Sequence, residues 1–371
     1  MKGEVVLSSP KQWDHVPVKN RVDRIRGLLY LLGKTTRRSS SPGFERPITL
    51  RTTRAQLYKA YKASRGESSA RDAIIREADE RDRLAREFLN QRQVTVSVAG
   101  EEQSAQFTIL TPRRTEDTQD NISKPAIVII PGISCDVDCV DAFAEELAFR
   151  GRKVTVVGYP ESFMGNATER FAEAVENSSS YKPHAEFFMQ AITALMKDQP
   201  IELWGFSTGS TIAANILSDP DFQQQVTSSV LLSPVGLIDQ KKSRMARGLF
   251  LEAGRVIKQI NSLGRYVYTY GRSDQDVQES QEERSIKRRI FGGLLKNIEH
   301  RFSAWNTMHV NGGNIVVVSS EKDSVTNSKK GLDNVRGIPQ VRILRLAHGS
   351  HNTPLINPRV VVPEIFQAQL V

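Results

Sequence analysis

The sequence predicts an α/β fold, in which a mostly parallel central sheet is flanked by helices. Two runs of alternating apolar and polar residues, 93–98 and 105–110, are joined by a glycine-containing turn, which is typical of a β-hairpin. Six further strand-like runs follow, with helical patterns between them, as in successive βα units. A Gly-Phe-Ser-Thr-Gly motif at 205–209 lies between one of these runs and a helical pattern.

The strand-like runs have the composition that a covered sheet requires. Residues 126–130, Ala-Ile-Val-Ile-Ile, are apolar throughout, which is typical of a strand buried on both faces. The later runs are 153–159, 201–205, 228–232, 314–320 and 341–346. Together with the hairpin they predict a sheet of eight strands, two antiparallel and six in βα units.

Ser207 stands at the centre of the G-x-S-x-G motif. The apolar segment 201–204 precedes the motif, and the small residues from Ser210 onward begin a helical pattern. A strand, this motif and a helix in that order form a nucleophile elbow, in which the glycines permit a sharp and strained turn. The turn lifts the serine hydroxyl above the sheet, so Ser207 is the candidate nucleophile.

Two further polar residues follow strand-like runs downstream of the elbow. Asp323 comes after the run 314–320, and His351 comes after the run 341–346. The chain order Ser207, Asp323, His351 is the serine, acid, histidine order of the α/β-hydrolase superfamily, and the chain resembles that superfamily from the hairpin onward. The alternative is another doubly wound α/β protein in which the serine motif is fortuitous.

The resemblance implies the α/β-hydrolase fold and a catalytic triad. Ser207 would attack the substrate. His351 would accept the serine proton and later donate it to the leaving group. Asp323 would hold the imidazole in the right tautomer and stabilise its protonated form.

Two neighbouring residues compete for these roles. In the superfamily the catalytic histidine follows a glycine-containing turn and precedes a proline and a final helix. This pattern favours His351, which follows Gly349, over His348. Glu321 competes with Asp323, but the Glu-Lys-Asp sequence after the strand resembles the acid loop of the family, where the last residue serves.

The resemblance also implies an oxyanion hole made of two backbone N–H groups. One would belong to Thr208, directly after the candidate nucleophile, and the other to Ile133, in the loop after the apolar run 126–130. That loop reads Pro-Gly-Ile-Ser where many relatives have His-Gly-x. Because the donor is a backbone group, the missing histidine does not remove it.

The predicted catalytic domain spans residues 93–371 and contains an insertion at about 236–312. Two amphipathic helical patterns, 243–263 and 285–308, fill most of this insertion, which is far longer than a connecting loop. In the superfamily an insertion at this point forms a lid over the active site. We therefore expect a helical lid whose apolar faces favour an acyl or aromatic substrate. The alternative is that these faces only pack against the sheet.

Residues 1–92 are predicted to form a basic, mostly helical N-terminal extension. The whole chain has a formal net charge of +9, and its excess of Lys and Arg lies within residues 1–100. A basic amphipathic segment can lie on an anionic membrane surface or touch nucleic acid. Acidic residues interrupt the basic ones and no nucleic-acid-binding motif is present. We therefore favour an extension packed on the catalytic domain, with weak contact to an anionic membrane as the alternative.

Composition excludes several other classes of protein. The 371 residues, 39% of them hydrophobic, suffice for the core of one main domain with additions. No run approaches the ~20 apolar residues that span a bilayer, and the N-terminus lacks the pattern of a signal peptide, so we expect a cytoplasmic protein. Cys135 and Cys139 have i, i+4 spacing, but no further metal ligands accompany them. We expect them to be packing residues and expect no metal.

The leading hypothesis is a serine hydrolase that cleaves a carboxylic ester or thioester of a small-molecule acyl substrate, with no cofactor. An acyltransferase or a C–C bond hydrolase with the same triad is the second hypothesis. The third is a catalytically silent protein of the same fold that binds a partner through its basic N-terminal region. A serine at the elbow excludes the carboxylate nucleophile of the dehalogenases and epoxide hydrolases of this superfamily.

Overall fold

The computed structural model describes residues 89–98, 100–112, 124–133, 137–162, 165–238, 243–245, 247–248, 251–252, 280–297, 303–326, 328–336, 338, 340–346, 349–356 and 358–370. Residues 1–88, and with them nearly all of the predicted N-terminal extension, lie outside the described residues. So do Cys135 and His348.

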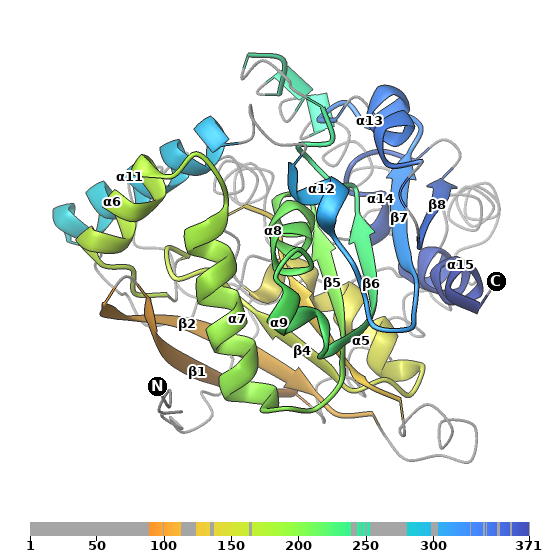
Figure 1. Ribbon diagram of the computed structural model, residues 1–371, viewed down its shortest axis with the longest axis horizontal. Helices are drawn as coiled ribbons and strands as arrows, with labels where there is room; N and C mark the ends of the chain where they lie inside the picture. Colours follow the sequence, from red (N-terminus) through yellow and green to blue (C-terminus); the bar gives the residue numbers. More distant parts are fainter. Residues whose placement is uncertain are drawn as a thin grey trace, which may run out of the picture.

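The sheet has eight strands: β1 (Leu89–Val98), β2 (Glu101–Leu110), β3 (Ala126–Ile130), β4 (Val154–Val157), β5 (Ile201–Phe206), β6 (Val226–Leu232), β7 (Ile315–Ser320) and β8 (Val341–Leu346). Their spatial order is β1-β2-β4-β3-β5-β6-β7-β8 (Figure 1). β2 runs antiparallel to both of its neighbours, and every other neighbouring pair is parallel. The predicted eight-stranded α/β sheet is thus confirmed, although β1 begins at Leu89, ahead of the expected residue 93.

Each face of the sheet has its own hydrophobic cluster. Side chains alternate across a strand, so Val128 and Ile130 of β3 belong to one cluster, and Ile127 and Ile129 belong to the other. Every residue of β3, β5 and β7 is buried. β3 is apolar throughout and β5 and β7 are largely apolar, because helices cover both faces, as is usual for a parallel sheet.

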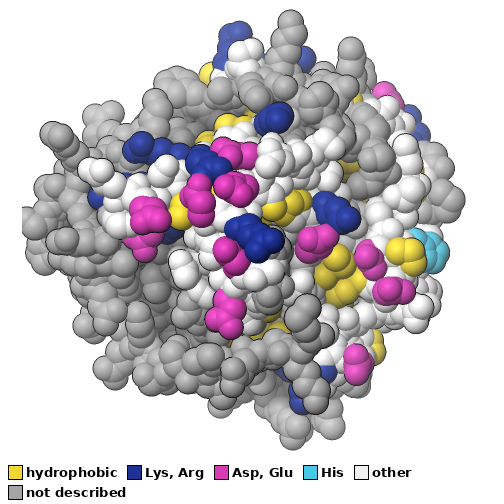
Figure 2. Space-filling model, turned by 60° about the vertical axis from the view of Figure 1, so that its left-hand side comes forward, with side chains coloured by type: hydrophobic (Ala, Val, Ile, Leu, Met, Phe, Trp, Pro, Cys, Tyr) yellow, Lys and Arg dark blue, Asp and Glu magenta, His cyan; other side chains and the backbone are white. Residues whose placement is uncertain are grey.

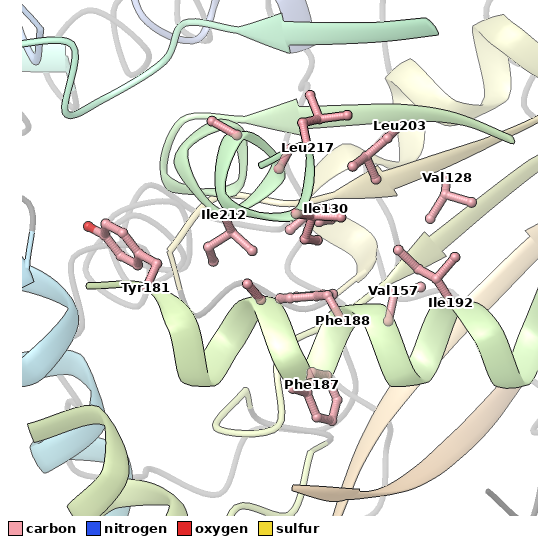
Figure 3. Close-up of a cluster of buried hydrophobic side chains, with 14 of the residues drawn as sticks. Val128, Ile130, Val157, Tyr181, Phe187, Phe188, Ile192, Leu203, Ile212 and Leu217 are labelled. Carbon is pink, nitrogen blue, oxygen red and sulfur yellow. The ribbon is translucent and has the colours of Figure 1, made fainter. Parts of the chain in front are cut away.

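The helices fall into two layers. The first cluster lies under α6 (Glu169–Asn177), α7 (Lys182–Met196), α8 (Thr208–Ile216), α11 (Gln281–Asn297), α12 (Ser303–Thr307) and α13 (Ser328–Val335). The second lies under η2 (Val137–Val140), α5 (Asp141–Phe149), α14 (Thr353–Ile356) and α15 (Pro358–Leu370). The short α9 (Pro220–Gln223) leads into β6. In Figure 3, side chains of α7 and α8 meet those of the sheet, among them Phe188, Ile212 and Ile130.

The chain between β6 and β7 contains the predicted insertion. Within its first predicted helix, residues 243–245, 247–248 and 251–252 are helical, and 253–279 lie outside the described residues. The second predicted helix, 285–308, is divided into α11 and α12. No helix within the described ranges is long and apolar enough to cross a membrane.

α11 packs along α6 (Figure 1). Arg289 of α11 donates to Glu176 at 2.6 Å between Nη2 and Oε2, and it also pairs with Glu169. The Tyr181 hydroxyl donates to the carbonyl oxygen of Leu294 at 3.1 Å. Figure 2 brings this side of the molecule forward and shows basic and acidic side chains interspersed on it. These contacts fix α11 to the body of the protein at several points along its length.

Candidate active site

The turn between β5 and α8 places Ser207 at its apex. Ser207 has φ 55° and ψ −117°, a conformation that residues with a side chain rarely adopt. A Cβ atom on Gly205 would lie 2.5 Å from the carbonyl oxygen of Gly209, and one on Gly209 would lie 2.2 Å from that of Pro131. Both motif glycines are therefore required by the close approach of the backbone. The Ser207 N–H donates to the carbonyl oxygen of Leu232 at 2.8 Å, which ties the turn to the end of β6.

The loops after β7 and β8 bring Asp323 and His351 to the same edge of the sheet as Ser207. This convergence follows from the topology, because the carboxyl ends of parallel strands share one edge. His351 Nε2 lies 2.9 Å from Ser207 Oγ, and His351 Nδ1 lies 2.8 Å from Asp323 Oδ2. Both the imidazole and the carboxylate are almost completely buried. An ionised Asp323 accepts from the Nδ1–H group, which leaves Nε2 free to accept the serine proton.

The second oxygen of Asp323 fixes the carboxylate in the loop. Oδ1 accepts the N–H groups of Val325 at 2.8 Å and Thr326 at 3.0 Å. This arrangement leaves Oδ2 facing the imidazole. Glu321, the competing acid, is instead 40% exposed and lies 3.7 Å from Arg345. Among the described residues, Asp323 is thus the acid that contacts His351.

Opposing effects determine the pKa of His351. Burial alone would lower it, because a buried imidazolium loses its hydration. The charge of Asp323, the hydrogen bond to Asp323 and the charge of Glu252 all favour the protonated form. Together they outweigh the burial and raise the pKa of His351 above its ordinary value of 6.5.

Two residues near His351 were not predicted from the sequence. Ser233, directly after β6, is buried, has φ 46°, and donates from Oγ to the carbonyl oxygen of His351 at 2.8 Å. Its position after a strand at the catalytic edge is a signal that could have identified it. Glu252 is also buried, and its Oε1 accepts the N–H of Asn352 at 3.1 Å. It lies in the insertion, where an acidic residue in a helical pattern carries no such signal.

The predicted oxyanion-hole residues belong to two segments that adjoin the serine. Thr208 is the first residue of α8, where backbone N–H groups have no partner within the helix. The loop after β3 passes next to the elbow: a Cβ atom on Gly132 would lie 3.7 Å from Ser207 Cβ, and Ile133 follows directly. Over the described ranges, no group of three or more His, Cys, Asp or Glu residues is arranged to hold a metal ion.

No protein-family model and no curated protein matches the sequence. Solved structures are similar. A probable hydrolytic enzyme from Pseudomonas aeruginosa is 14% identical with a TM-score of 0.54, over 75% of this chain and 94% of that one. A thermophilic esterase from Thermogutta terrifontis is 13% identical with a TM-score of 0.51, over 75% of this chain and 97% of that one. An α/β-hydrolase fold protein from Chitinophaga pinensis is 11% identical with a TM-score of 0.52, over 74% of this chain and 95% of that one. The sheet order, the elbow and these likenesses together show that the chain has the α/β-hydrolase fold.

Proposed function

We propose that the protein is a serine hydrolase that cleaves a carboxylic ester or thioester through an acyl-enzyme intermediate. One observation carries this proposal. Ser207, His351 and Asp323 form a continuous hydrogen-bonded chain, with 2.9 Å and 2.8 Å between its members, at the apex of a strained turn. A serine alcohol is a poor nucleophile at neutral pH, and such a chain is the arrangement that activates it.

In the first half of the reaction, Ser207 Oγ attacks the acyl carbon of the substrate. His351 Nε2 takes the serine proton as the new C–O bond forms, and Asp323 stabilises the resulting imidazolium. The tetrahedral intermediate then collapses. The bond to the leaving alcohol or thiol breaks, the leaving group takes the proton from Nε2, and the acyl group stays on Ser207.

The negative charge of the tetrahedral intermediate requires hydrogen-bond donors already in place. The backbone N–H groups of Thr208 and Ile133 would supply them, because both lie at the elbow on the two segments nearest Ser207. Backbone donors held by a helix terminus and a tight loop do not have to reorient during the reaction. Such preorganisation is among the largest contributions to acyl-transfer catalysis.

In the second half, water replaces the leaving group. His351, neutral again, takes a proton from the water that attacks the acyl carbon, and the bond to Ser207 Oγ breaks. The imidazolium returns that proton to the serine, which releases the carboxylic acid. Two of the similar structures are described as a thermophilic esterase and as a probable hydrolytic enzyme, which supports a hydrolytic function.

Hydrolysis of chromogenic esters and thioesters tests the proposal. The full-length protein should release p-nitrophenol from acyl esters, with a rapid first turnover if deacylation is slower than acylation. Ser207→Ala should reduce the rate to the level of the uncatalysed reaction while the folded structure is retained. Ser210→Ala is the matched control, since the Ser210 hydroxyl donates to the backbone carbonyl oxygens of Gly205 and Leu232. Absence of hydrolysis for every acyl chain length in wild-type protein would contradict the proposal.

A further inference from the structure

The first part of the insertion lies against the loop that carries Asp323. Ser324 Oγ donates to the carbonyl oxygen of Gly248 at 3.2 Å. A Cβ atom on Gly248 would lie 2.1 Å from the carbonyl oxygen of Ser324, so only glycine allows this approach. The segment around Gly248 is therefore seated directly on the acid loop.

The same segment reaches the histidine loop through Glu252. The Glu252 side chain is buried, with 2% of the residue exposed, and its Oε1 accepts the N–H of Asn352 at 3.1 Å. Asn352 directly follows His351. An ionised carboxylate that is buried to this extent requires hydrogen-bond donors or a positive charge nearby. The Asn352 N–H supplies a donor, and a protonated His351 supplies a charge.

The peptide group between His351 and Asn352 is held at both of its polar ends. Its carbonyl oxygen accepts from Ser233 Oγ at 2.8 Å, and its N–H donates to Glu252 Oε1 at 3.1 Å. In a trans peptide group the C=O and the N–H lie in the peptide plane and point in opposite directions. Ser233 and Glu252 therefore restrain the backbone of the base from opposite sides, and Asp323 restrains its ring.

We propose that Glu252 is a positioning residue for His351, which fixes the backbone of the base and stabilises the imidazolium that forms when Ser207 loses its proton. This inference rests on the proposed serine-hydrolase function and adds an acid that the triad does not contain. It also makes the insertion part of the catalytic apparatus, because the acid comes from the insertion and not from the sheet.

Within the described part of the chain, the charges found to act on His351 are those of Asp323 and Glu252, and both favour its protonated form. Glu252→Gln removes one negative charge but keeps a side-chain oxygen that can accept from the Asn352 N–H. The pKa of His351 should then fall. A neutral base is the active form, so the acid limb of the activity profile should move to lower pH. The maximal rate should decrease, by less than the roughly 100-fold that loss of a general base costs, because the imidazolium is less stabilised.

The test measures the rate of covalent labelling by a fluorophosphonate as a function of pH, in the full-length protein. Wild type, Glu252→Gln, Glu252→Ala and Glu321→Gln are compared. Glu321→Gln is the matched control, since it makes the same change in the acid loop but at an exposed side chain. We expect the midpoint to move to lower pH in both Glu252 variants and to stay at the wild-type value in Glu321→Gln. Glu252→Ala should also label more slowly than Glu252→Gln at its plateau, because the Asn352 N–H has lost its acceptor.

Two results would overturn the inference. One is a labelling midpoint in Glu252→Gln at the same pH as in wild type, and the other is a shift of the midpoint in Glu321→Gln as large as that in Glu252→Gln. Titration of the His351 imidazole by NMR provides the second measurement for any variant that labels too slowly. A pKa of His351 in Glu252→Gln equal to that in wild type would also overturn the inference. Failure of wild-type protein to label at any pH would instead contradict the proposed function. The two failures are thus distinguishable.

Discussion

The Ser233 hydroxyl donates a hydrogen bond of 2.8 Å to the carbonyl oxygen of His351, which lies 118 residues further along the chain. Ser233 has a positive φ of 46°, and its own N–H donates to Val318 of β7 at 2.8 Å. The end of β6 is thereby connected to the loop that carries the base. A residue outside the triad thus holds the histidine in place through its backbone.

Replacing Ser233 by alanine should lower both the kcat of ester hydrolysis and the free energy of unfolding. The loss of kcat should exceed the loss seen in a control variant of similar stability. Loss of one buried hydrogen bond costs about 1 kcal/mol of unfolding free energy. The turnover should also fall, because the peptide group between His351 and Asn352 loses one of the two hydrogen bonds described for it. Ser229→Ala is the matched control: Ser229 lies in β6, shortly before Ser233, and donates to the Leu203 carbonyl oxygen at 2.6 Å. The Ser229→Ala substitution should lower the free energy of unfolding by a similar amount and leave kcat near the wild-type value. Equal kcat values for the two variants would refute the positioning role of Ser233.

The histidine assignment makes a separate prediction. His351→Ala should lower kcat by several orders of magnitude, as loss of a triad member does, with little change in the far-UV circular dichroism spectrum. His348→Ala should retain most of the activity. Steady-state hydrolysis of one ester by both variants provides the comparison. A larger loss in His348→Ala would reassign the base.

The activity should depend on pH through His351. Burial by itself lowers the pKa of His351, but the charge and hydrogen bond of Asp323 and the charge of Glu252 raise it above 6.5. The imidazole must be neutral to accept the serine proton. Therefore kcat/KM should be full above the raised pKa and decline as the pH falls through it, with a midpoint above 6.5. A profile measured with a non-ionising ester should show this, and a midpoint below 6.5 would be inconsistent with the arrangement of charges described.

Two adjacent glycines test the packing of α11 on α6. A Cβ atom on Gly292 would meet nothing within 4 Å, so Gly292→Ala should stabilise the protein by about 1 kcal/mol through helix propensity. A Cβ atom on Gly293 would lie 2.8 Å from Val175 Cγ1, so Gly293→Ala should destabilise it by roughly 1–3 kcal/mol. Urea unfolding of the two variants measures the difference. Equal stabilisation by both substitutions would show that α11 does not pack closely on α6 in solution.

The sequence allowed the sheet and the elbow to be predicted because their signals are local. Continuous apolar runs indicate covered strands, and G-x-S-x-G between a strand and a helix indicates the turn at Ser207. The loops with Asp323 and His351 could be placed at one edge because parallel strands end there. The first strand was placed too late, since Leu89–Arg92 include polar residues that do not show the alternation of the later residues.

The contacts around His351 could not be predicted in the same way. Glu252 reaches the site from an insertion whose path depends on tertiary packing. Its burial against Asn352 leaves no pattern in the sequence. In the second helical pattern of the insertion, 285–308, the apolar residues Ile290 and Leu294 are buried. Its periodicity nonetheless did not show that α11 ends at Asn297 and that α12 begins separately at Ser303.

Mass spectrometry of the fluorophosphonate-treated protein determines whether Ser207 is an activated nucleophile. The probe forms a stable phosphonyl ester only with an activated serine, and Ser207 is the serine whose Oγ lies 2.9 Å from His351 Nε2. We predict a single adduct on the peptide that contains Ser207 in wild-type protein, and none in Ser207→Ala. Wild-type protein without an adduct on that peptide, under conditions that label a known serine esterase completely, would show that Ser207 is not activated and would favour a catalytically silent protein of the same fold.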